Sequence, residues 1–401
     1  MALYKDIVKK IPVQAEKKTK QKEYMNEGLL PIIDQGQKII GGYTDDLSKR
    51  VECDLPAIVF GDHTRCVKLI KKPFAPGADG IKVIRPADDS LYIEYLFYAT
   101  KYLAAKIRDK GYARHYQDVE KQEINVPSVS AQKEIVSRIE ERLSSLDNAV
   151  ETLNKTKKQL AIYRQAVLKD AFEGKWNYNY RTEAKLTDDM KAIPLNNGEV
   201  DLPKEWKYVY LSSLGDLSRG KSKHRPRNDS RLFEDGKYPF FQTGDVKSAR
   251  RELVDCEKMY GEFGLQQSKL WPAGTLCITI AANIAETCFL GVDGCFPDSI
   301  VGFTPDEDKV NKEYVRYFIE ASKLRLWAFA PATAQKNINL TTLENLMIPY
   351  CSLDEQKFIV DMIDSRLSEC DAIDETVDMA LKQSEAMRQS ILKEAFEGRL
   401  V

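Results

Sequence analysis

A basic stretch in the second half of the chain carries the side chains best suited to binding an anion. Residues 219–227 hold five Lys or Arg side chains together with His224. Gly220 and Pro226 argue against a regular helix or strand, so we expect a loop. Closely spaced cations on a loop suit the phosphates of nucleic acid, and a solvated charged loop without a partner is the alternative. The candidate phosphate contacts are Arg219, Lys221, Lys223, Arg225 and Arg227.

Amide, amine and imidazole groups in other expected loops are suited to the edges of DNA bases. Residues 333–339 form a polar loop before a short apolar strand, and the alternative role for its amides is to cap a neighbouring helix. The second-half candidates for base contacts are Thr243, Gln335, Lys336 and Asn337. The first-half candidates are Gln35, Lys38, His63, Arg65, Arg114, His115 and Tyr116.

One short pattern imitates a metal-dependent nuclease. Asp298 follows Pro297, and residues 307–309 read Glu-Asp-Lys, a spacing with which carboxylates can hold Mg²⁺. Acidic residues in a turn and at the start of a helix explain the same pattern better. The chain has no glycine-rich phosphate loop, no dinucleotide-binding glycine turn and no Asn-Pro-Pro-aromatic motif. We therefore expect no catalytic site, no bound cofactor and no metal in this chain.

Charge is distributed unevenly along the 401 residues, although the net charge is only −1. Residues 1–130 carry 22 basic and 18 acidic side chains, whereas residues 354–401 carry 6 basic and 12 acidic ones. Basic patches therefore remain available for nucleic acid despite the low net charge. No apolar run is long enough to span a membrane, the start of the chain lacks an apolar signal region, and the eight cysteines form no metal-binding or disulfide pattern. We expect a cytoplasmic protein.

A long internal repeat organises the sequence. Residues 132–175 return 224 positions later as residues 356–399, and the two copies match at 21 of 44 positions without gaps. Apolar residues in both copies recur at a four–three spacing, no proline interrupts them, and Gly174 and Gly398 follow the last apolar positions. Each copy is expected to be one long helix, and the two are expected to pack as an antiparallel coiled coil. Two unrelated amphipathic helices in separate cores are the alternative.

The repeat continues more weakly upstream of the two helices. Leu30-Pro31-Ile32-Ile33 resembles Tyr238-Pro239-Phe240-Phe241, and the start of an aromatic helix near Ile93 resembles that near Lys312. The expected fold is mixed α+β, with two globular domains, two long helices and a pseudo-twofold internal repeat. The predicted domains are 1–130, the first long helix 131–175, a linker 176–205, the second globular domain 206–351 and the second long helix 352–401.

Taken in this order, the features resemble the specificity subunit of type I restriction–modification systems. The resemblance covers nearly the whole chain. It depends on the duplicated globular domain and helix, on the tails Leu168–Gly174 and Leu392–Gly398, and on residues 332–338 before the second apolar strand. The first half departs from the pattern of that loop, with Ala113-Arg114-His115-Tyr116 in place of Ala334-Gln335-Lys336-Asn337.

The resemblance implies a DNA-binding subunit without catalytic activity. Each globular domain, as a target-recognition domain, would read one half of a bipartite double-stranded target, and the helices would fix the spacer between the halves. Two modification subunits would dock on the helices, and restriction subunits are a further partner that the resemblance allows. Those partners, rather than this chain, would use S-adenosylmethionine, ATP and Mg²⁺. The alternative is a non-catalytic coiled-coil adaptor that binds only protein, which leaves the two basic, amide-rich globular domains unexplained.

Overall fold

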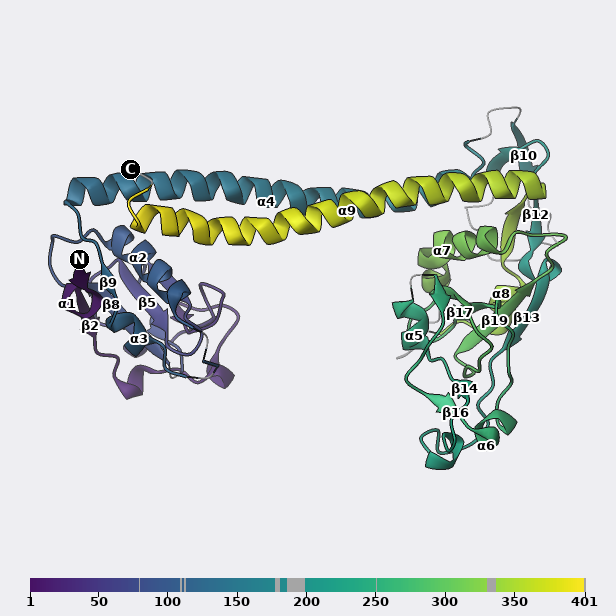
Figure 1. Cartoon of the computed structure of the whole chain (residues 1–401), viewed down its shortest axis with the longest axis horizontal. Helices are drawn as coiled ribbons and strands as arrows, with labels where there is room; N and C mark the ends of the chain where they lie inside the picture. Colours follow the sequence, from purple (N-terminus) through teal and green to yellow (C-terminus); the bar gives the residue numbers. More distant parts are fainter. Residues whose placement is uncertain are drawn as a thin grey trace. The chain divides into compact units, whose positions relative to one another are not determined.

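A computed structural model describes residues 1–78, 80–108, 110–111, 113–176, 181–185, 199–249, 251–329 and 337–399 (Figure 1). The chain divides into two compact units. Unit 1 comprises Met1–Thr156 and Thr376–Val401, and unit 2 comprises Lys157–Glu375. Each unit therefore contains one globular domain, part of helix α4 (Val129–Phe172) and part of helix α9 (Leu353–Phe396).

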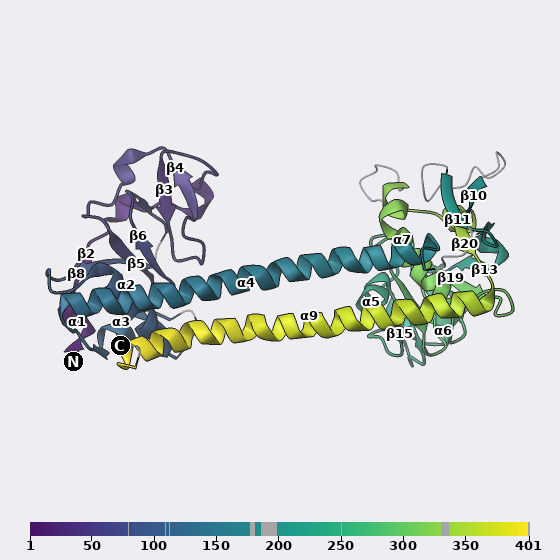
Figure 2. The same cartoon turned by 90° about the horizontal axis from the view of Figure 1, so that it is seen from above.

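The core of unit 1 is a four-stranded antiparallel sheet with helix α2 (Ile93–Lys106) packed against it. In sheet order its strands are β2 (Val8–Ile11), β8 (Ile81–Pro86), β5 (Ala57–Gly61) and β6 (Val67–Ile70). A second small sheet lies beside it in Figure 2, formed by β4 (Gly42–Thr44), β3 (Leu30–Ile33) and β7 (Ala75–Pro76). The remaining elements are β1 (Ala2–Leu3), β9 (Glu123–Ile124), α1 (Tyr4–Ile7), α3 (Tyr116–Glu120) and the 3-10 turns η1 (Ala15–Lys17), η2 (Gln21–Glu23) and η3 (Leu47–Lys49).

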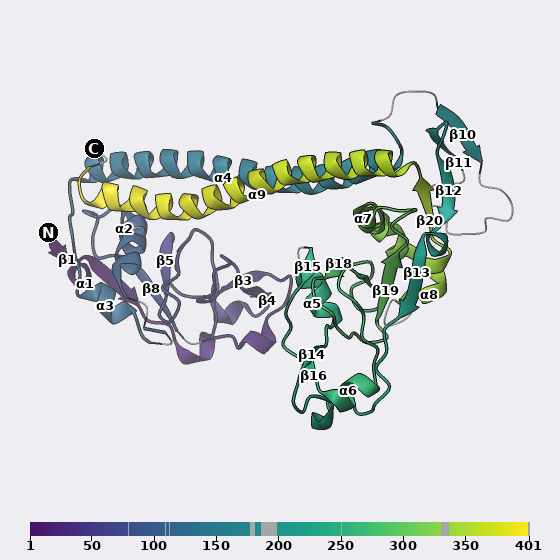
Figure 3. The same cartoon turned by 45° about the vertical axis from the view of Figure 1, so that its right-hand side comes forward.

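Unit 2 repeats this arrangement with additions. Its main sheet has the order β13 (Gly215–Arg219), β19 (Ile300–Pro305), β17 (Leu276–Thr279), β18 (Thr287–Leu290) and β15 (Glu252–Leu253). Helix α7 (Lys312–Phe329) takes the place of α2, and β14 (Tyr238–Pro239) pairs with β16 (Met259–Tyr260) on the side of the sheet away from α9 (Figure 3). The remaining elements are β10 (Arg181–Lys185), β11 (Glu199–Pro203), β12 (Lys207–Tyr210), β20 (Met347–Tyr350), α5 (Thr243–Ser248), α6 (Glu262–Gln266), α8 (Leu340–Glu344), η4 (Leu211–Ser213) and η5 (Ser230–Leu232).

The strand pairings confirm the weak upstream repeat. Antiparallel pairing of β2 with β8 in unit 1 matches that of β13 with β19 in unit 2, and β5 with β6 matches β17 with β18. Ile32 lies in parallel register with Ala75, and Phe240 in parallel register with Cys295. The Leu30–Ile33 strand and the Tyr238–Phe241 segment therefore occupy equivalent places, as their sequences predict.

Within each unit, α4 and α9 run antiparallel. In unit 1, Arg142 pairs with Glu394 at 2.9 Å and Arg388 pairs with Asp147. In unit 2, Arg164 pairs with Asp371 at 2.6 Å. The residue number rises on one helix as it falls on the other, which defines an antiparallel pair. The predicted antiparallel coiled coil and mixed α+β fold are confirmed.

Candidate nucleic-acid interface

One end of the unit 1 sheet gathers the loops that carry most of the first-half candidates. At this end β2 and β5 finish at Ile11 and Gly61, and β6 and β8 begin at Val67 and Ile81. The turn between β5 and β6 holds His63 and Arg65. A hydrogen bond from the backbone N–H of Asp62 to Gly80 O, at 2.6 Å, ties that turn to the loop before β8.

Gln35 and His63, two of the predicted residues, meet at this end. The His63 backbone N–H donates to Gln35 Oε1 at 3.3 Å, and Thr64 Oγ1 donates to the Gln35 carbonyl at 2.5 Å. Gly80 has φ +96°, and a Cβ there would lie 2.8 Å from Gln35 Oε1 and 2.9 Å from His63 Cδ2. This position therefore requires glycine, both for its backbone and for the closeness of its neighbours.

The loop after α2 completes the group. His63 Nδ1 lies 3.1 Å from Ala113 O, which places exposed Arg114 beside the β5–β6 turn. Arg65 is held by a hydrogen bond from Nη1 to Ile107 O at 2.8 Å. Lys38 is exposed on the loop that follows β3, three residues after Gln35. Gln35, Lys38, His63, Arg65 and Arg114 thus belong to adjoining loops.

Two of the first-half candidates have to be corrected. His115 is fully buried and Tyr116 is 2% exposed. His115 Nδ1 lies 3.1 Å from Asp62 O, and the Tyr116 backbone N–H donates to Asp62 Oδ1 at 2.9 Å. The Tyr116 ring packs edge-on against Phe60 in the core. Both residues hold Asp62 and the β5–β6 turn in place, so neither can reach DNA. Their polar side chains beside Arg114 predicted exposure. Both residues lie at the start of helix α3, which packs them into the core.

A lysine-rich segment at the same end of unit 1 was not among the predicted contacts. It follows β2 and runs over residues 17–22, with Lys20 and Lys22 exposed. Lys17 Nζ donates to Arg50 O at 2.7 Å, and the Thr19 N–H donates to Pro76 O at 3.1 Å, so the segment is anchored. Its place between β2 and β3 is that of the basic loop between β13 and β14 in unit 2. The signal was present in the sequence, but only the strand equivalence identifies the segment as the counterpart.

In unit 2 the equivalent end of the sheet carries the basic loop. Here β13 and β17 finish at Arg219 and Thr279, and β18 and β19 begin at Thr287 and Ile300. The Gly220 N–H donates to Ile300 O at 2.8 Å, and the Ile280 N–H donates to Ser299 O at 3.0 Å. The basic loop and the β17–β18 turn therefore lie on either side of the start of β19.

The five basic side chains of this loop divide into two groups. Three arginines bind the protein itself. Arg219 Nε donates to Asp298 O at 2.8 Å, Arg227 Nη2 to Asp298 Oδ1 at 2.7 Å, and Arg225 Nη1 to Ser222 O at 2.7 Å. Lys221 and Lys223 are held through their backbone N–H groups, by Phe296 O and Gln267 O, and their ammonium groups have no partner among the described residues. The two lysines are therefore best placed to meet phosphates.

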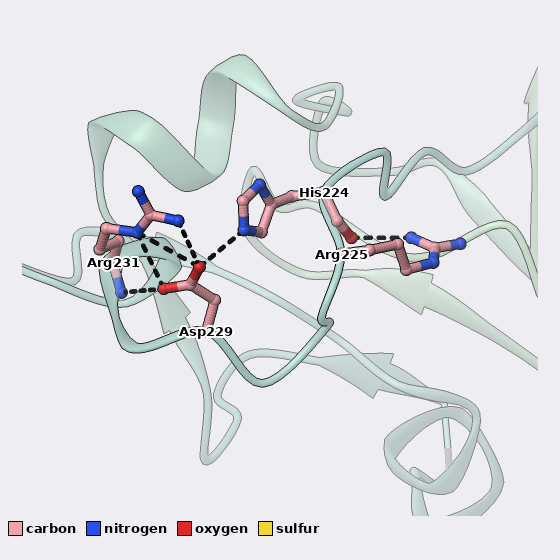
Figure 4. A network of polar contacts seen from close by, with 4 residues as sticks. All are labelled: His224, Arg225, Asp229 and Arg231. Carbon is pink, nitrogen blue, oxygen red and sulfur yellow. Dashed lines mark hydrogen bonds and ion pairs between the residues drawn. The ribbon is translucent and has the colours of Figure 1, made fainter.

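A second network fixes the far side of the loop (Figure 4). Asp229 Oδ2 accepts from Arg231 Nη2 and lies 2.7 Å from His224 Nε2, and Asp229 Oδ1 accepts from the Arg231 N–H at the start of η5. The hydrogen bonds from Arg231, and then that from His224, lower the pKa of Asp229 far below its usual range. A lowered carboxyl pKa contributes stability that is present above the unfolded pKa of about 3.9 and is lost only as pH falls toward the lowered value. The network therefore persists at neutral and mildly acidic pH.

Gly220 allows the basic loop to lie directly on a neighbouring segment. A Cβ at this position would lie 2.2 Å from Pro297 O and 2.5 Å from Phe296 O, both backbone atoms. No side chain fits there without moving one of the two segments. The glycine thus lets the backbone that carries Lys221 and Lys223 lie close to the Phe296–Pro297 segment.

The remaining second-half candidates are Thr243, Asn337, Gln335 and Lys336. Thr243 opens α5, whose start has a capping box formed by Gln242 and Asp245. Asn337 is exposed and pairs with Ala281 of the β17–β18 turn through an isolated β-bridge. Gln335 and Lys336 lie outside the described residues. Asn337 thus lies beside the basic end of the sheet.

The nuclease-like residues have other partners. Asp298 binds Arg227, and Lys309 Nζ pairs with Asp306 Oδ2 at 2.6 Å, which lowers the pKa of Asp306 and raises that of Lys309. In the part of the chain that the structure describes, no three acidic, His or Cys side chains are grouped so that they could hold a metal ion. Within the same residues, none of the helices combines the length and the apolar character that crossing a bilayer requires.

Comparison with known proteins gives a result that agrees with this geometry. The family model described as the type I restriction modification DNA specificity domain matches residues 4–161 and 203–383. The two matches cover most of the chain, and each begins near the start of a globular domain and ends within the long helix that follows it. The chain belongs to the family of type I restriction–modification specificity proteins, as the resemblance in the sequence predicts.

Two specificity subunits and two solved structures illustrate the similarity. The chain is 23% identical to the EcoR124I/EcoR124II specificity subunit of Escherichia coli over 86% of this chain and 81% of that protein. It is also 23% identical to the EcoBI specificity subunit of E. coli over 69% of this chain, but this match spans only 58% of that relative. The solved HsdS subunit from Thermoanaerobacter tengcongensis has the same fold, with a TM-score of 0.57 at 18% identity over 99% of this chain and 96% of the other. A chain from a structure on assembly and conformational transition of the type I R-M system gives a TM-score of 0.70 at 17% identity, over 99% and 97% of the two chains.

Proposed function

We propose that this chain is the DNA-recognition subunit of a type I restriction–modification complex, with each unit reading one half of a bipartite double-stranded target. The observation that carries the proposal is the duplication of the DNA specificity domain together with a basic loop at the same end of each sheet. Lys221 and Lys223 would contact phosphates in one half, and Lys20 and Lys22 in the other. Phosphate contacts supply affinity, and neighbouring amide and imidazole groups supply base selection.

The subunit supplies recognition and no chemistry of its own. Methyl transfer and DNA cleavage belong to separate modification and restriction subunits, which use S-adenosylmethionine, ATP and Mg²⁺. Family membership supports the recognition role, and the ion pairs of Asp298 and Lys309 occupy the side chains that a nuclease would need. In this proposal the cation–carboxylate pairs hold loops together.

The paired long helices are proposed as the docking surface for modification subunits. In unit 1 a groove of about 510 Å³ lies along the helix pair, lined by Leu146, Ala149, Met387 and Ile391 and bordered by Arg142 and Glu394. Met387 is 53% exposed, although it is a large apolar side chain. An apolar floor with charged borders is typical of a protein–protein contact.

Selection from a pool of random-sequence duplexes tests the recognition role directly. We expect the full-length chain, alone or mixed with its modification subunits, to enrich a motif of two fixed parts separated by unspecified base pairs. Binding should weaken steeply with salt, because phosphate contacts release counterions. Binding without any enriched motif, or failure to bind duplexes at all, would contradict the proposal and favour the adaptor.

The absence of chemistry has its own test. The chain alone, incubated with duplex DNA, S-adenosylmethionine, ATP and Mg²⁺, should neither methylate nor cut it. Addition of modification subunits should produce methylation of adenine within the selected motif. Cleavage by the chain alone that disappears on Asp298→Asn would overturn this part of the proposal.

A further inference from the structure

The turn between β17 and β18 in unit 2 is held in an unusual backbone conformation. Ala282 and Ala285 have φ of 63° and 60°, a region that residues other than glycine rarely adopt. Hydrogen bonds fix the turn: the Ala285 N–H donates to Thr279 O at 2.8 Å, the Glu286 N–H donates to Thr279 Oγ1 at 3.0 Å, and Thr279 Oγ1 donates to Asn283 O. Left-handed backbone that is fixed so firmly by its surroundings often lies at a functional site.

The turn presents Asn283 to a lysine from a different element. Lys247 Nζ, on α5, donates to Asn283 Oδ1 at 3.5 Å. Lys247 is exposed and Asn283 is half-buried. The Asn283 backbone N–H is bound to Ala281 O at 2.8 Å, so the backbone is anchored independently of the side chain. Helix α5 is itself fixed at its start, where the Gln242 N–H donates to Asp245 Oδ2 at 2.7 Å.

The place of this pair in the fold matches that of Gln35 and His63 in unit 1. In both units, the turn that follows the third strand in sheet order, β5 or β17, is hydrogen-bonded to a segment that follows the parallel-paired one. In unit 1 the His63 backbone N–H donates to the Gln35 side chain, and in unit 2 the Asn283 side chain accepts from Lys247. In both, the loop after the aromatic helix joins the turn, through His115 N to Asp62 O at 2.9 Å and through Ile338 N to Ile280 O at 3.0 Å. Arg65 in the unit 1 turn also has a positive φ, of 58°.

The chemistry of the pair suits the edges of purine bases. Lysine donates to the O6 and N7 atoms of guanine, and asparagine both accepts from N6 and donates to N7 of adenine in the major groove. Lys221 and Lys223 lie at the same end of the sheet and would hold the adjacent phosphates.

We propose that Lys247 and Asn283 read purine bases in the half-site bound by unit 2. This assignment rests on the proposed function, because it requires that the chain recognise a DNA sequence. It adds two residues and a strained turn to the surface formed by the basic loop and Asn337.

Selection of random-sequence duplexes by the full-length chain, followed by titration of the selected duplex and its single-base variants, tests the assignment. Lys247→Ala and Asn283→Asp should each lower discrimination at one or two base positions of a single half-site, by about 5- to 150-fold. The other half-site and the binding of unselected duplex should remain. Asn283→Asp keeps the shape of the side chain but replaces its N–H donor with a charge, so folding should be unaffected.

Two controls separate this result from others. Lys309→Ala removes a lysine at the opposite end of β19 and should leave both half-sites unchanged. His63→Ala should alter the half-site that Lys247→Ala leaves intact. Variants that select the same bases with the discrimination of the wild type would overturn the assignment while leaving the proposed function standing. A wild-type chain that enriches no motif would contradict the proposed function, and the assignment would fall with it.

Discussion

Units 1 and 2 agree most closely where the globular domain meets the long helices. Gln132 and Gln356 are both fully buried at the same position of the repeat. Gln132 Oε1 accepts from the Tyr92 N–H at 2.7 Å, and Gln356 Oε1 accepts from the Asn311 N–H at 2.9 Å. Their Nε2 groups donate to Pro127 O at 2.8 Å and Cys351 O at 2.9 Å. Each glutamine thus binds the start of a long helix to the segment just before it and to the start of the aromatic helix.

Aromatic residues repeat the same correspondence. Tyr95 donates through its hydroxyl to Asn125 O and Tyr314 to Pro349 O, each at 2.8 Å. The end of each long helix then packs on one of these tyrosines. Phe396 lies 5.2 Å from the Tyr95 ring, and Phe172 lies 5.0 Å from the Tyr314 ring, measured between centroids. Every unit is therefore built from the start of one helix and the end of the other.

The two units differ at the end of the sheet that carries the candidate interface. In unit 2 the basic loop is held by hydrogen bonds of Arg219, Arg227 and Asp229. In unit 1 its counterpart is the lysine-rich segment, held by the hydrogen bond from Lys17 to Arg50 O. The β5–β6 turn holds His63 and the β17–β18 turn holds Asn283. Side chains that attach the domain to the helices stayed the same while those of the opposing loops changed. Such divergence suits two domains that read different DNA sequences.

The largest expected effect comes from the ends of the long helices. Phe172 is 6% exposed and contacts Tyr314 and Phe318, so Phe172→Ala should cost about 3–5 kcal/mol in unit 2. Phe396 is only half-buried, so Phe396→Ala should lower the stability of unit 1 by less than Phe172→Ala lowers that of unit 2. Hydrogen exchange resolved by residue measures both. Phe172→Ala should increase exchange in α7, and Phe396→Ala in α2. Increased exchange in α2 for Phe172→Ala, or in α7 for Phe396→Ala, would contradict the packing of each helix end on its own unit.

The two buried glutamines should give the next largest effect. Replacing either by Ala leaves buried backbone groups without partners, at a cost of about 1–3 kcal/mol. Gln132 has three hydrogen bonds of 2.7–2.8 Å, whereas one of those of Gln356 is 3.5 Å long, so Gln132→Ala should cost more. Urea unfolding with local exchange measures the difference. The exposed neighbour Lys357 is a control, and its replacement by Ala should change stability by less than about 0.5 kcal/mol. A loss of stability at the control equal to that at the glutamines would argue against a stabilising role for the hydrogen bonds of Gln132 and Gln356.

Sequence alone predicts the scaffold better than the interface. The heptad spacing and the repeat fix the two long helices, because such a pattern admits few packings. The basic loop could be predicted from composition, but its division into bracing arginines and available lysines depends on Asp298, far away in the chain. The predicted DNA contacts His115 and Tyr116 are wrong because a polar side chain is not always exposed, and both are buried. Lys247 and Asn283 could not be found, since only the folded turn brings them together.

Lysine pairs in the two units should have matching and smaller effects. Lys221→Ala with Lys223→Ala, and separately Lys20→Ala with Lys22→Ala, should each lower the slope of log K against log salt by about 1.8, at about 0.9 per phosphate contact. Across a fourfold change in salt this amounts to about tenfold in affinity, or about 1.4 kcal/mol. Binding titrations of unselected duplex at several salt concentrations measure it, with Lys309→Ala as the control. An unchanged slope for one pair would remove that loop from the interface and break the equivalence of the units.

The smallest effect is expected from the ion pairs between the long helices. Each copy of the repeat supplies one Asp and one Arg at matched positions, and antiparallel pairing brings Arg164 to Asp371 and Arg388 to Asp147. The carboxylates are 70% and 58% exposed, so water and salt screen both pairs. Double-mutant cycles with Ala should give coupling energies of about 0.2–1 kcal/mol that shrink as salt rises. The pair Glu134–Arg138, within one helix, is a control that should couple no more strongly. A coupling above about 2 kcal/mol at either site, or one that salt leaves unchanged, would mean that these pairs stabilise the coiled coil rather than merely favour its register.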